Sequence, residues 1–186
     1  MPYYNKRNFF LASINSVLNQ TYQKLEIIIV YDDQDKNDLE YIKSCIKKDL
    51  RVKIIFNDKN MGVAYSRNKA ISMAQGDYIA FLDCDDYWKL NKTEVQLNFM
   101  ITHGYDFCYT TYQVINFNGK ITSTITAREK LDYKELLKSC DIGLSSVILK
   151  RKLLSDMKFP ELKTKEDFVL WLGLAKKSVN LMGLDK

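Results

Sequence analysis

The sequence predicts a single α/β domain built on a mostly parallel β-sheet. Two runs, residues 25–31 and 78–82, are almost continuously apolar, which is typical of strands buried on both faces. Segments of helical periodicity alternate with such runs, and this order is typical of parallel strands joined by crossover helices. With 186 residues, of which 46% are hydrophobic, the chain is long enough to bury one sizeable core.

Hydrophobic spacing sets the elements expected in the first half. Residues 8–19 place most of their apolar side chains on one side of a helix, whereas residues 25–31 are rich in β-branched side chains. The same two patterns recur further along the chain. In order, we expect helix 8–19, strand 25–31, helix 38–49, strand 52–56, helix 63–74 and strand 78–82.

The second half is less regular. Asn118 and Gly119 form a strong turn signal between two strand-like runs, which predicts a hairpin. In order, we expect helix 91–102, strands 107–115 and 120–126, helix 131–139, strand 145–149 and helix 166–177. No internal repeat, low-complexity segment or linker interrupts the chain, so one domain is expected to span residues 1–186.

The two ends of the chain lie outside this regular order. Residues 1–5 look like the exit of a strand whose body is missing, and residues 181–186 stop abruptly. A doubly wound domain that begins with a helix lacks a central strand. We therefore expect a sheet without its first strand and a domain truncated at both ends.

Composition excludes several classes of site. The net charge of +5 is mild and its basic clusters are short, so no nucleic-acid partner is indicated. The four cysteines form no CxxC pair and His103 is the only histidine, which argues against zinc sites and disulfide frameworks. The sequence contains neither GxxxxGK[ST] nor GxGxxG. No signal peptide or long apolar run is present, so the expected location is the cytoplasm.

Three carboxylates follow the apolar run 78–82. Asp83, Asp85 and Asp86 lie just past the expected strand end, where open α/β sheets place their ligands. Such close acids repel one another unless a cation lies between them. Mg²⁺ takes one or two carboxylates and fills its shell with substrate phosphates. The pattern therefore predicts a metal–diphosphate site.

Other polar segments allow a functional and a structural interpretation. Asp32 and Asp33 follow strand 25–31 and can bind a base or ribose, or form a polar turn. Arg67, one turn into helix 63–74, can reach a diphosphate or point into solvent. Glu166 and Asp167 begin the last helix, where acids favour the helix dipole, but a rigid carboxylate there can also deprotonate a hydroxyl.

Taken together, these segments resemble the family 2 inverting glycosyltransferases of bacterial surface-polysaccharide synthesis. The resemblance covers residues 1 to about 175. It rests on segment 16–22 (Ser-Val-Leu-Asn-Gln-Thr-Tyr), on segment 26–33, on Asn60 with Gly62, on Arg67-Asn68, on segment 76–88, and on Glu166-Asp167 with Leu170-Trp171.

The resemblance implies a GT-A fold, a Rossmann-like three-layer α/β/α sandwich. Its nucleotide-binding half would span about residues 1–88 and its acceptor half about 89–186. Donor binding would involve the backbone of Pro2 to Tyr4, the base-reading Asp32, and Arg67 near the base or diphosphate. Asp83-Cys84-Asp85 matches the DxD motif. Asp83 would face the ribose and diphosphate, and Asp85 would hold Mg²⁺ or Mn²⁺.

The resemblance further implies the reaction and its partners. Asp167 is similar to the catalytic base, with Glu166 as the second candidate. A sugar would move from a nucleotide-diphosphate sugar, such as a UDP-sugar, to a glycan or lipid-linked acceptor with inversion at the anomeric carbon. The enzyme would be cytoplasmic, at the inner face of the membrane. Two alternatives are nucleotidyl transfer and donor binding without turnover. The donor sugar, acceptor, linkage and oligomeric state have no readable signal.

Overall fold

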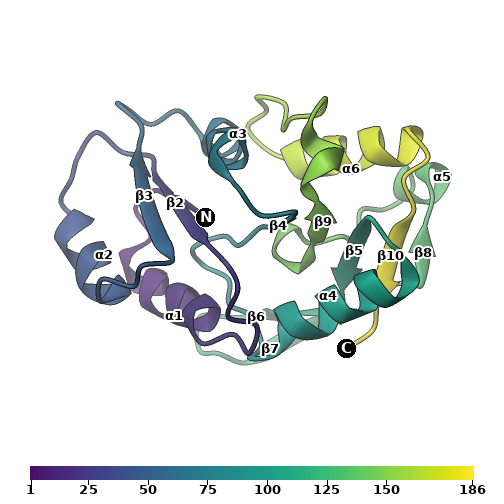
Figure 1. Ribbon diagram of the computed structural model, residues 1–186, viewed down its shortest axis with the longest axis horizontal. Helices are drawn as coiled ribbons and strands as arrows, with labels where there is room; N and C mark the ends of the chain where they lie inside the picture. Colours follow the sequence, from purple (N-terminus) through teal and green to yellow (C-terminus); the bar gives the residue numbers. More distant parts are fainter.

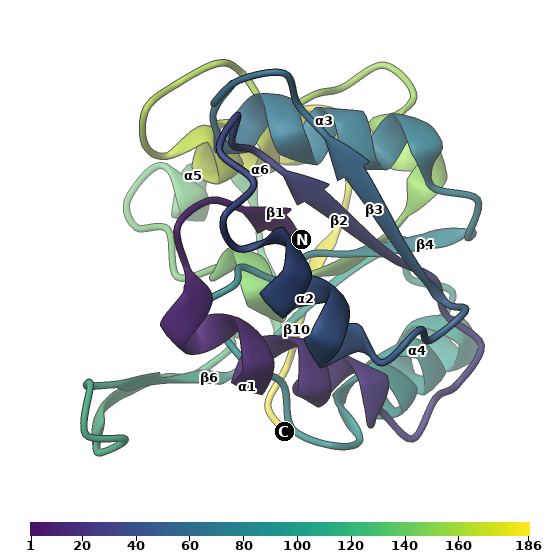
Figure 2. The same ribbon diagram turned by 90° about the vertical axis from the view of Figure 1, so that its left-hand side faces the viewer.

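Two β-sheets lie next to each other along the long axis of the computed structural model, which describes residues 1–186 (Figure 1). The first sheet has the order β1-β2-β3, formed by Pro2–Tyr3, Ile27–Tyr31 and Val52–Phe56, and all its pairs are parallel. Helix α3 lies on one face, and helices α1 and α2 lie on the other (Figure 2). These helices are Arg7–Leu18 (α1), Leu39–Ile46 (α2) and Val63–Met73 (α3).

The second sheet has the order β4-β9-β5-β10-β8. Its strands are Tyr78–Ala80 (β4), Ile148–Lys150 (β9), Phe107–Thr110 (β5), Leu181–Leu184 (β10) and Lys130–Leu131 (β8). Only β5 and β10 are parallel. Helix α6, Glu166–Lys176, lies on one face and helix α4, Lys92–His103, on the other (Figure 1).

Alternating side chains of β5 explain how both helices pack on this sheet. Phe107 points to the α6 side, where its ring lies 5.2 Å from that of the fully buried Trp171. Cys108 points to the opposite side and packs with Leu97 and Met100 of α4. Successive strand residues face opposite sides of a sheet, so this one strand anchors both helical layers.

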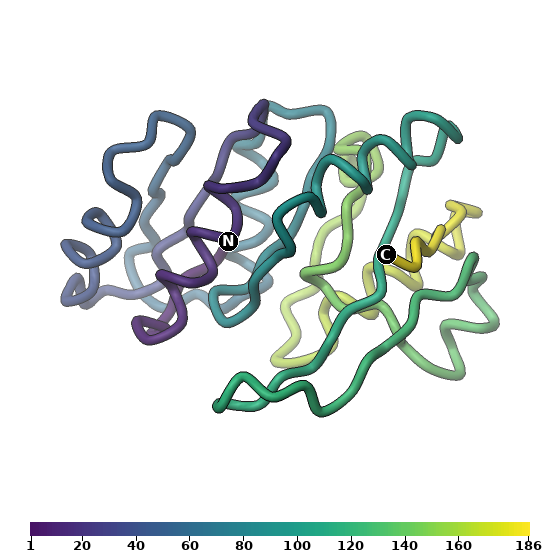
Figure 3. The backbone as a smooth tube through the Cα atoms, turned by 90° about the horizontal axis from the view of Figure 1, so that it is seen from below, coloured from purple at the N-terminus to yellow at the C-terminus, as the bar shows by residue number.

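A two-stranded hairpin stands apart from both sheets. Strands β6, Tyr112–Ile115, and β7, Ile121–Ile125, pair antiparallel with an irregularity between Val114 and Ile115. The hairpin extends away from the body of the domain (Figures 2 and 3). Helix α5, Tyr133–Leu136, and the 3₁₀ helices Leu144–Ser146 (η1) and Arg151–Leu154 (η2) complete the fold. No helix is both long and apolar enough to cross a membrane.

The predicted α/β class with parallel strands is confirmed, and the second sheet adds antiparallel strands to it. The parallel pattern holds in the first sheet, where helices cross over between strands. In the second sheet, long connections bring β9 antiparallel to β4 and β5, and β10 antiparallel to β8. Residues 107–115, expected as one strand, are divided at Thr111. The backbone N–H of Thr111 donates to the Leu184 carbonyl, and its hydroxyl donates to the Asp185 carboxylate.

Residues 1–5 were expected at the exit of a strand, whereas no strand was expected at residues 181–186. Residues 2–3 form the short strand β1, which pairs with the end of β2, and Tyr3 is fully buried. Residues 181–184 form β10, between β5 and β8. A Cβ at Gly183 would lie 1.9 Å from the Arg128 carbonyl oxygen. Only glycine therefore permits this close approach of two backbones.

Candidate active site

Asp32 follows β2 and is enclosed by the turn that leads into α3. One carboxylate oxygen accepts hydrogen bonds from the Asn57 amide and the Met61 backbone N–H, both at 2.7 Å. The other accepts the Gly62 N–H at 2.9 Å, and Gly62 has a φ of +89°, a value that favours glycine. Asp32 is only 3% exposed. It therefore holds this turn, and a base can reach only its remaining lone pairs.

Arg67 joins chain segments that are far apart in sequence. Its side chain is 5% exposed and projects from α3. The guanidinium forms an ion pair with Asp83 at 2.8 Å and a second, short one with Glu166, 99 residues away. It also lies 5.4 Å from the centroid of the Phe159 ring, while its Nε has no hydrogen-bond partner. Arg67 therefore does not point into solvent, and it connects the strand-end acids to the start of α6.

The loop from Asp83 to Trp88, called the acid loop below, is held by Ser145. The Ser145 Oγ accepts the Asp83 N–H at 3.2 Å and donates to the Asp86 carboxylate at 2.6 Å. The Trp88 indole donates to the Ser145 carbonyl at 2.8 Å. Desolvation raises the pKa of Asp86, and the charges of Asp83 and Asp85 raise it further. A bound cation would relieve this accumulation of negative charge.

The acid loop offers oxygen ligands for a divalent cation without forming a complete cage. The Asp85 side chain is 42% exposed and pairs with Lys6 at 2.6 Å. No group of three or more His, Cys, Asp or Glu side chains is arranged to hold a metal. Mg²⁺ commonly takes one or two carboxylates and completes its shell with water and phosphates. Asp83 and Asp85 fit such an ion, because an exposed ion pair such as that of Lys6 is weak and easily exchanged.

The two acids that begin α6 have different surroundings. Glu166 is 7% exposed, and its carboxylate is taken up by the ion pair with Arg67. Asp167 is half-buried and accepts the Phe168 backbone N–H at 2.7 Å. Desolvation raises the pKa of Asp167, and the neighbouring charge of Glu166 adds to the rise. A raised pKa and partial exposure make Asp167 the better proton acceptor of the two.

The other predicted donor-binding residues lie beside the acid loop. The Pro2 carbonyl, in β1, accepts the Cys84 S–H at 3.0 Å. Cys84 is 3% exposed, and burial raises the pKa of its thiol to about 12. Its side chain therefore belongs to the core, which leaves its backbone for a ligand. Tyr4 is half exposed next to β1. The ligand-binding roles of these residues stay predictions.

Two residues of the site were not singled out from the sequence. Ser145, expected only as the first residue of a strand, binds partners 57 to 62 residues away. Tyr112, at the base of the hairpin, has a pKa raised by desolvation and, to a smaller degree, by charges that include Asp86 and Asp167. Its ring packs against Gly143, two residues before Ser145. No local pattern distinguishes either residue, because their partners are distant in sequence.

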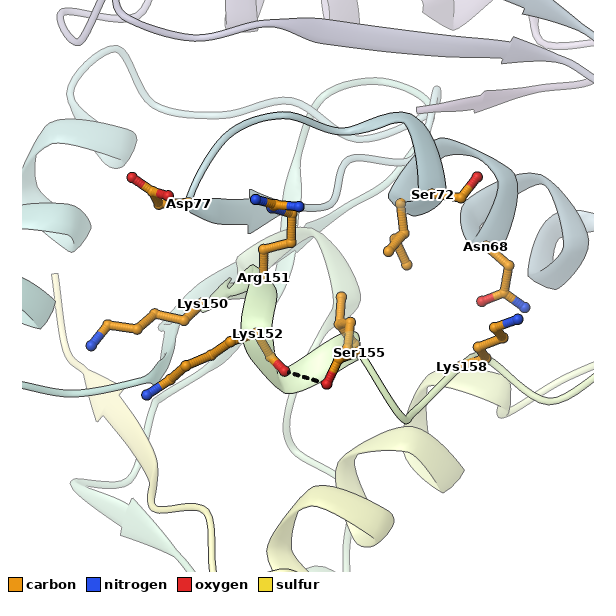
Figure 4. Close-up of a pocket in the computed structure, with 10 residues that line it drawn as sticks. Asn68, Ser72, Asp77, Lys150, Arg151, Lys152, Ser155 and Lys158 are labelled. Carbon is orange, nitrogen blue, oxygen red and sulfur yellow. Dashed lines mark hydrogen bonds between the residues drawn. The ribbon is translucent and has the colours of Figure 1, made fainter.

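A cavity of about 640 Å³ lies elsewhere, between α3 and η2 (Figure 4). Its lining includes Lys150 and Lys152, which pair with Asp106 at 2.6 and 2.8 Å. The Arg151 Nε donates to the Gly76 carbonyl at 2.8 Å. None of the predicted site residues lines this cavity. The carboxylates and the buried arginine therefore place the candidate active site at the acid loop.

Known proteins resemble this chain along its whole length. An Escherichia coli protein, UDP-Glc:alpha-D-GlcNAc-diphosphoundecaprenol beta-1,3-glucosyltransferase WfgD, is 41% identical over 176 residues, covering 95% of this chain and 68% of that protein. The putative teichuronic acid biosynthesis glycosyltransferase TuaG of Bacillus subtilis is 35% identical over 186 residues, covering 100% of this chain and 74% of that protein.

Solved structures share the fold. S. aureus TarS 1–349 in complex with UDP superposes with a TM-score of 0.77 at 25% identity, covering 98% of this chain and 56% of that one. The mannosyltransferase PcManGT from Pyrobaculum calidifontis, in complex with GDP-Man and Mn²⁺, gives a TM-score of 0.72 at 13% identity, covering 100% and 53%. The chain thus spans just over half of each solved structure and has the GT-A glycosyltransferase fold. The model of glycosyl transferase family 2 matches residues 1–162, and the chain belongs to this family.

Proposed function

We propose that this domain transfers a sugar from a UDP-sugar to a lipid-linked glycan acceptor, with inversion at the anomeric carbon, in surface-polysaccharide synthesis. The observation that carries the proposal is the cluster of acids around Arg67, drawn from the acid loop and from the start of α6. The names of the relatives support the substrate classes, since one states UDP-Glc and a diphosphoundecaprenol acceptor. The TarS complexes with UDP and UDP-GlcNAc support the same donor class.

The charges of the site suit a diphosphate that arrives with a divalent cation. The carboxylates of this cluster outnumber Arg67 and Lys6, the two side-chain cations that form ion pairs with them; they are those of Asp83, Asp85, Asp86, Glu166 and Asp167. An anionic diphosphate alone would be repelled by this cluster. A divalent ion held by Asp83 and Asp85 would neutralise charge on the departing diphosphate.

Asp167 performs the proton transfer in this proposal. Its carboxylate takes the proton of the acceptor hydroxyl as the acceptor oxygen bonds to the anomeric carbon. The bond from that carbon to the diphosphate breaks, and UDP leaves with the electron pair. Attack opposite the leaving group inverts the configuration. Glu166 does not compete for this role. If it took the proton, the ion pair with Arg67 would be lost and the buried guanidinium would have one fewer charged partner.

Calorimetric titration with UDP, with and without Mn²⁺, tests donor binding, and transfer from UDP-glucose tests turnover. Asp85→Ala should abolish Mn²⁺-dependent UDP binding. Asp167→Asn should bind UDP as the wild type does and lower transfer by at least about a hundredfold, the lower range for loss of a general base. Asp156→Ala, at an exposed acid outside the site, is the matched control and should change neither.

The outcomes separate the alternatives. If the folded wild type binds UDP with Mn²⁺ but transfers no sugar to any acceptor, the domain is a binding module and the proposed catalysis is wrong. If Asp85→Ala and Asp167→Asn lose UDP binding equally, the assignment of one to the metal and the other to the proton fails.

A further inference from the structure

The β6–β7 hairpin carries an apolar tip that no other part of the domain covers. Phe117, in its turn, is 97% exposed, and Val114, Ile115 and Ile121 are between 36% and 50% exposed. The ring of Phe9, in α1, lies 6.5 Å from that of Phe117. The hairpin extends away from both sheets (Figures 2 and 3). An uncovered apolar projection of this kind is typical of a contact surface.

The charge of the hairpin is equally distinctive. Lys120 is the only charged residue between Phe107 and Ala127, in a chain in which 27% of residues are charged. No carboxylate would therefore have to approach an anionic surface together with the tip. A single exposed lysine beside an apolar tip complements negatively charged headgroups above an acyl layer.

Most backbone N–H groups of the turn have partners within the turn. The Asn116 side-chain oxygen accepts the N–H groups of Asn118 and Lys120, both at 3.0 Å. The Asn116 backbone exchanges further bonds with Gly119 and Lys120 at 2.9 and 3.0 Å. Transfer of a polar backbone into a less polar layer is costly only where its groups lack partners. These bonds lower the cost of placing the turn in a headgroup layer, where water and headgroups can bind the remaining polar groups.

The base of the hairpin leads to the candidate active site. Tyr112 begins β6, and a Cβ added at Gly143 would lie 3.0 Å from its ring. Gly143 lies two residues before Ser145, which binds Asp83 and Asp86 of the acid loop. An element whose tip touches a membrane would thus hold the acids of the site at a fixed distance from the bilayer surface. A lipid-linked acceptor presents its hydroxyl at that level.

We propose that the β6–β7 hairpin docks on the surface of an anionic phospholipid bilayer, inserting Phe117 among the acyl chains and placing Lys120 among the headgroups. This proposal rests on the proposed function in one respect, since a lipid-linked acceptor is the reason for expecting a bilayer as the partner. A second copy of this chain is the other occupant to consider. The irregular pairing between Val114 and Ile115 disfavours edge-to-edge pairing of β6, because such irregularities interrupt the exposed ladder.

Vesicle flotation of the whole chain tests this proposal without requiring turnover. Vesicles of phosphatidylethanolamine and phosphatidylglycerol should bind the wild type more strongly than vesicles of phosphatidylcholine. Phe117→Ser should weaken partitioning about tenfold, the order expected for burial of one large apolar side chain. Lys120→Gln should weaken it about fivefold on the anionic vesicles only.

Leu50→Ser is the matched control. Leu50 is also an apolar residue, 98% exposed, and lies just before β3 of the first sheet. It should leave partitioning unchanged. All variants should keep the far-UV circular dichroism of the wild type, because the replaced side chains are exposed.

The results distinguish the two proposals. If the wild type does not bind anionic vesicles, or if Phe117→Ser and Leu50→Ser weaken binding equally, the hairpin is not a membrane contact. A change of sedimentation from dimer to monomer in Phe117→Ser, with partitioning unchanged, would overturn the proposal in favour of a second copy. Metal-dependent UDP binding should be equal in the wild type and Phe117→Ser. Its absence from both would refute the proposed function and leave the vesicle result standing.

Discussion

Replacing Glu166 by Gln should lower the free energy of unfolding by about 2–3 kcal/mol. The change keeps the size of the side chain and removes its charge. Glu166 is 7% exposed and its partner Arg67 is 5% exposed, so water cannot replace the lost interaction. The variant therefore measures how much the fold depends on the ion pair that joins α3 to α6.

The magnitude follows from what remains around the guanidinium. Removing one member of a buried ion pair commonly costs about 3–5 kcal/mol, because the other charge stays buried without its partner. Here Asp83 keeps its ion pair with Arg67 at 2.8 Å. The new amide oxygen can also still accept from the guanidinium. Both effects reduce the cost to the range of a charged hydrogen bond, about 2–3 kcal/mol.

Urea unfolding at neutral pH, followed by circular dichroism, is the assay. In a separate thermal unfolding experiment, the melting temperature of a domain of this size should fall by about 4–12 °C. Asp85→Asn is the matched control, because it makes the same change at a half-exposed ion pair with Lys6. An exposed pair contributes little, so this variant should lie within about 0.5 kcal/mol of the wild type. The free energy of unfolding should fall with urea concentration at the same slope in both variants if their native states are equally compact.

Two results would refute this reasoning. If Glu166→Gln is as stable as Asp85→Asn, the pair with Arg67 does not connect the two segments as the structure indicates. If Glu166→Gln keeps its stability but loses transfer while Asp167→Asn keeps transfer, the roles of the two acids must be exchanged.

Three further predictions concern stability. Gly183→Ala should cost more than about 2 kcal/mol, because its Cβ would collide with the Arg128 carbonyl, whereas Gly76→Ala meets only an ordinary 3.4 Å contact and serves as control in the same urea series. Asn57→Ala should cost about 1–3 kcal/mol, since its amide donates to a buried carboxylate, and thermal unfolding measures this. Asp167→Asn should be more stable than the wild type at pH 7, by less than about 1 kcal/mol, and should lose this advantage near pH 3. Folding raises the pKa of Asp167, so its ionisation destabilises the wild type as pH rises through the folded-state pKa. Urea unfolding at both pH values checks the sign.

The sequence predicted best those elements that have strong local patterns. Helix 63–74 is observed as Val63–Met73, and strand 52–56 is observed as Val52–Phe56. Both depend on the spacing of side chains within a few residues, which a single sequence contains. The acid loop was also placed correctly past a strand end, although strand 78–82 is observed only as Tyr78–Ala80 and only Ile79 in it is buried.

Elements that depend on distant partners were missed or misassigned. Strand β10 has only four residues, and it forms because Leu181 and its neighbours fit between β5 and β8. Its glycine weakens a strand pattern in sequence, yet the close backbone of Arg128 requires that glycine in space. Helix 131–139 is observed only over Tyr133–Leu136, although its capping box between Asp132 and Glu135 is present. A cap marks where a helix begins but does not determine its length.

Arg67 shows why a site is harder to predict than a fold. From sequence, its place one turn into a helix left solvent and a diphosphate as possible partners. In the structure the guanidinium forms ion pairs with Asp83 and Glu166. These carboxylates neutralise its positive charge before a donor binds. Arg67 alone therefore cannot attract the diphosphate, and the unpaired acids near it oppose binding. A divalent cation at Asp85 would reverse that local charge, which is why the metal-dependent titration tests the site more directly than any substitution of Arg67.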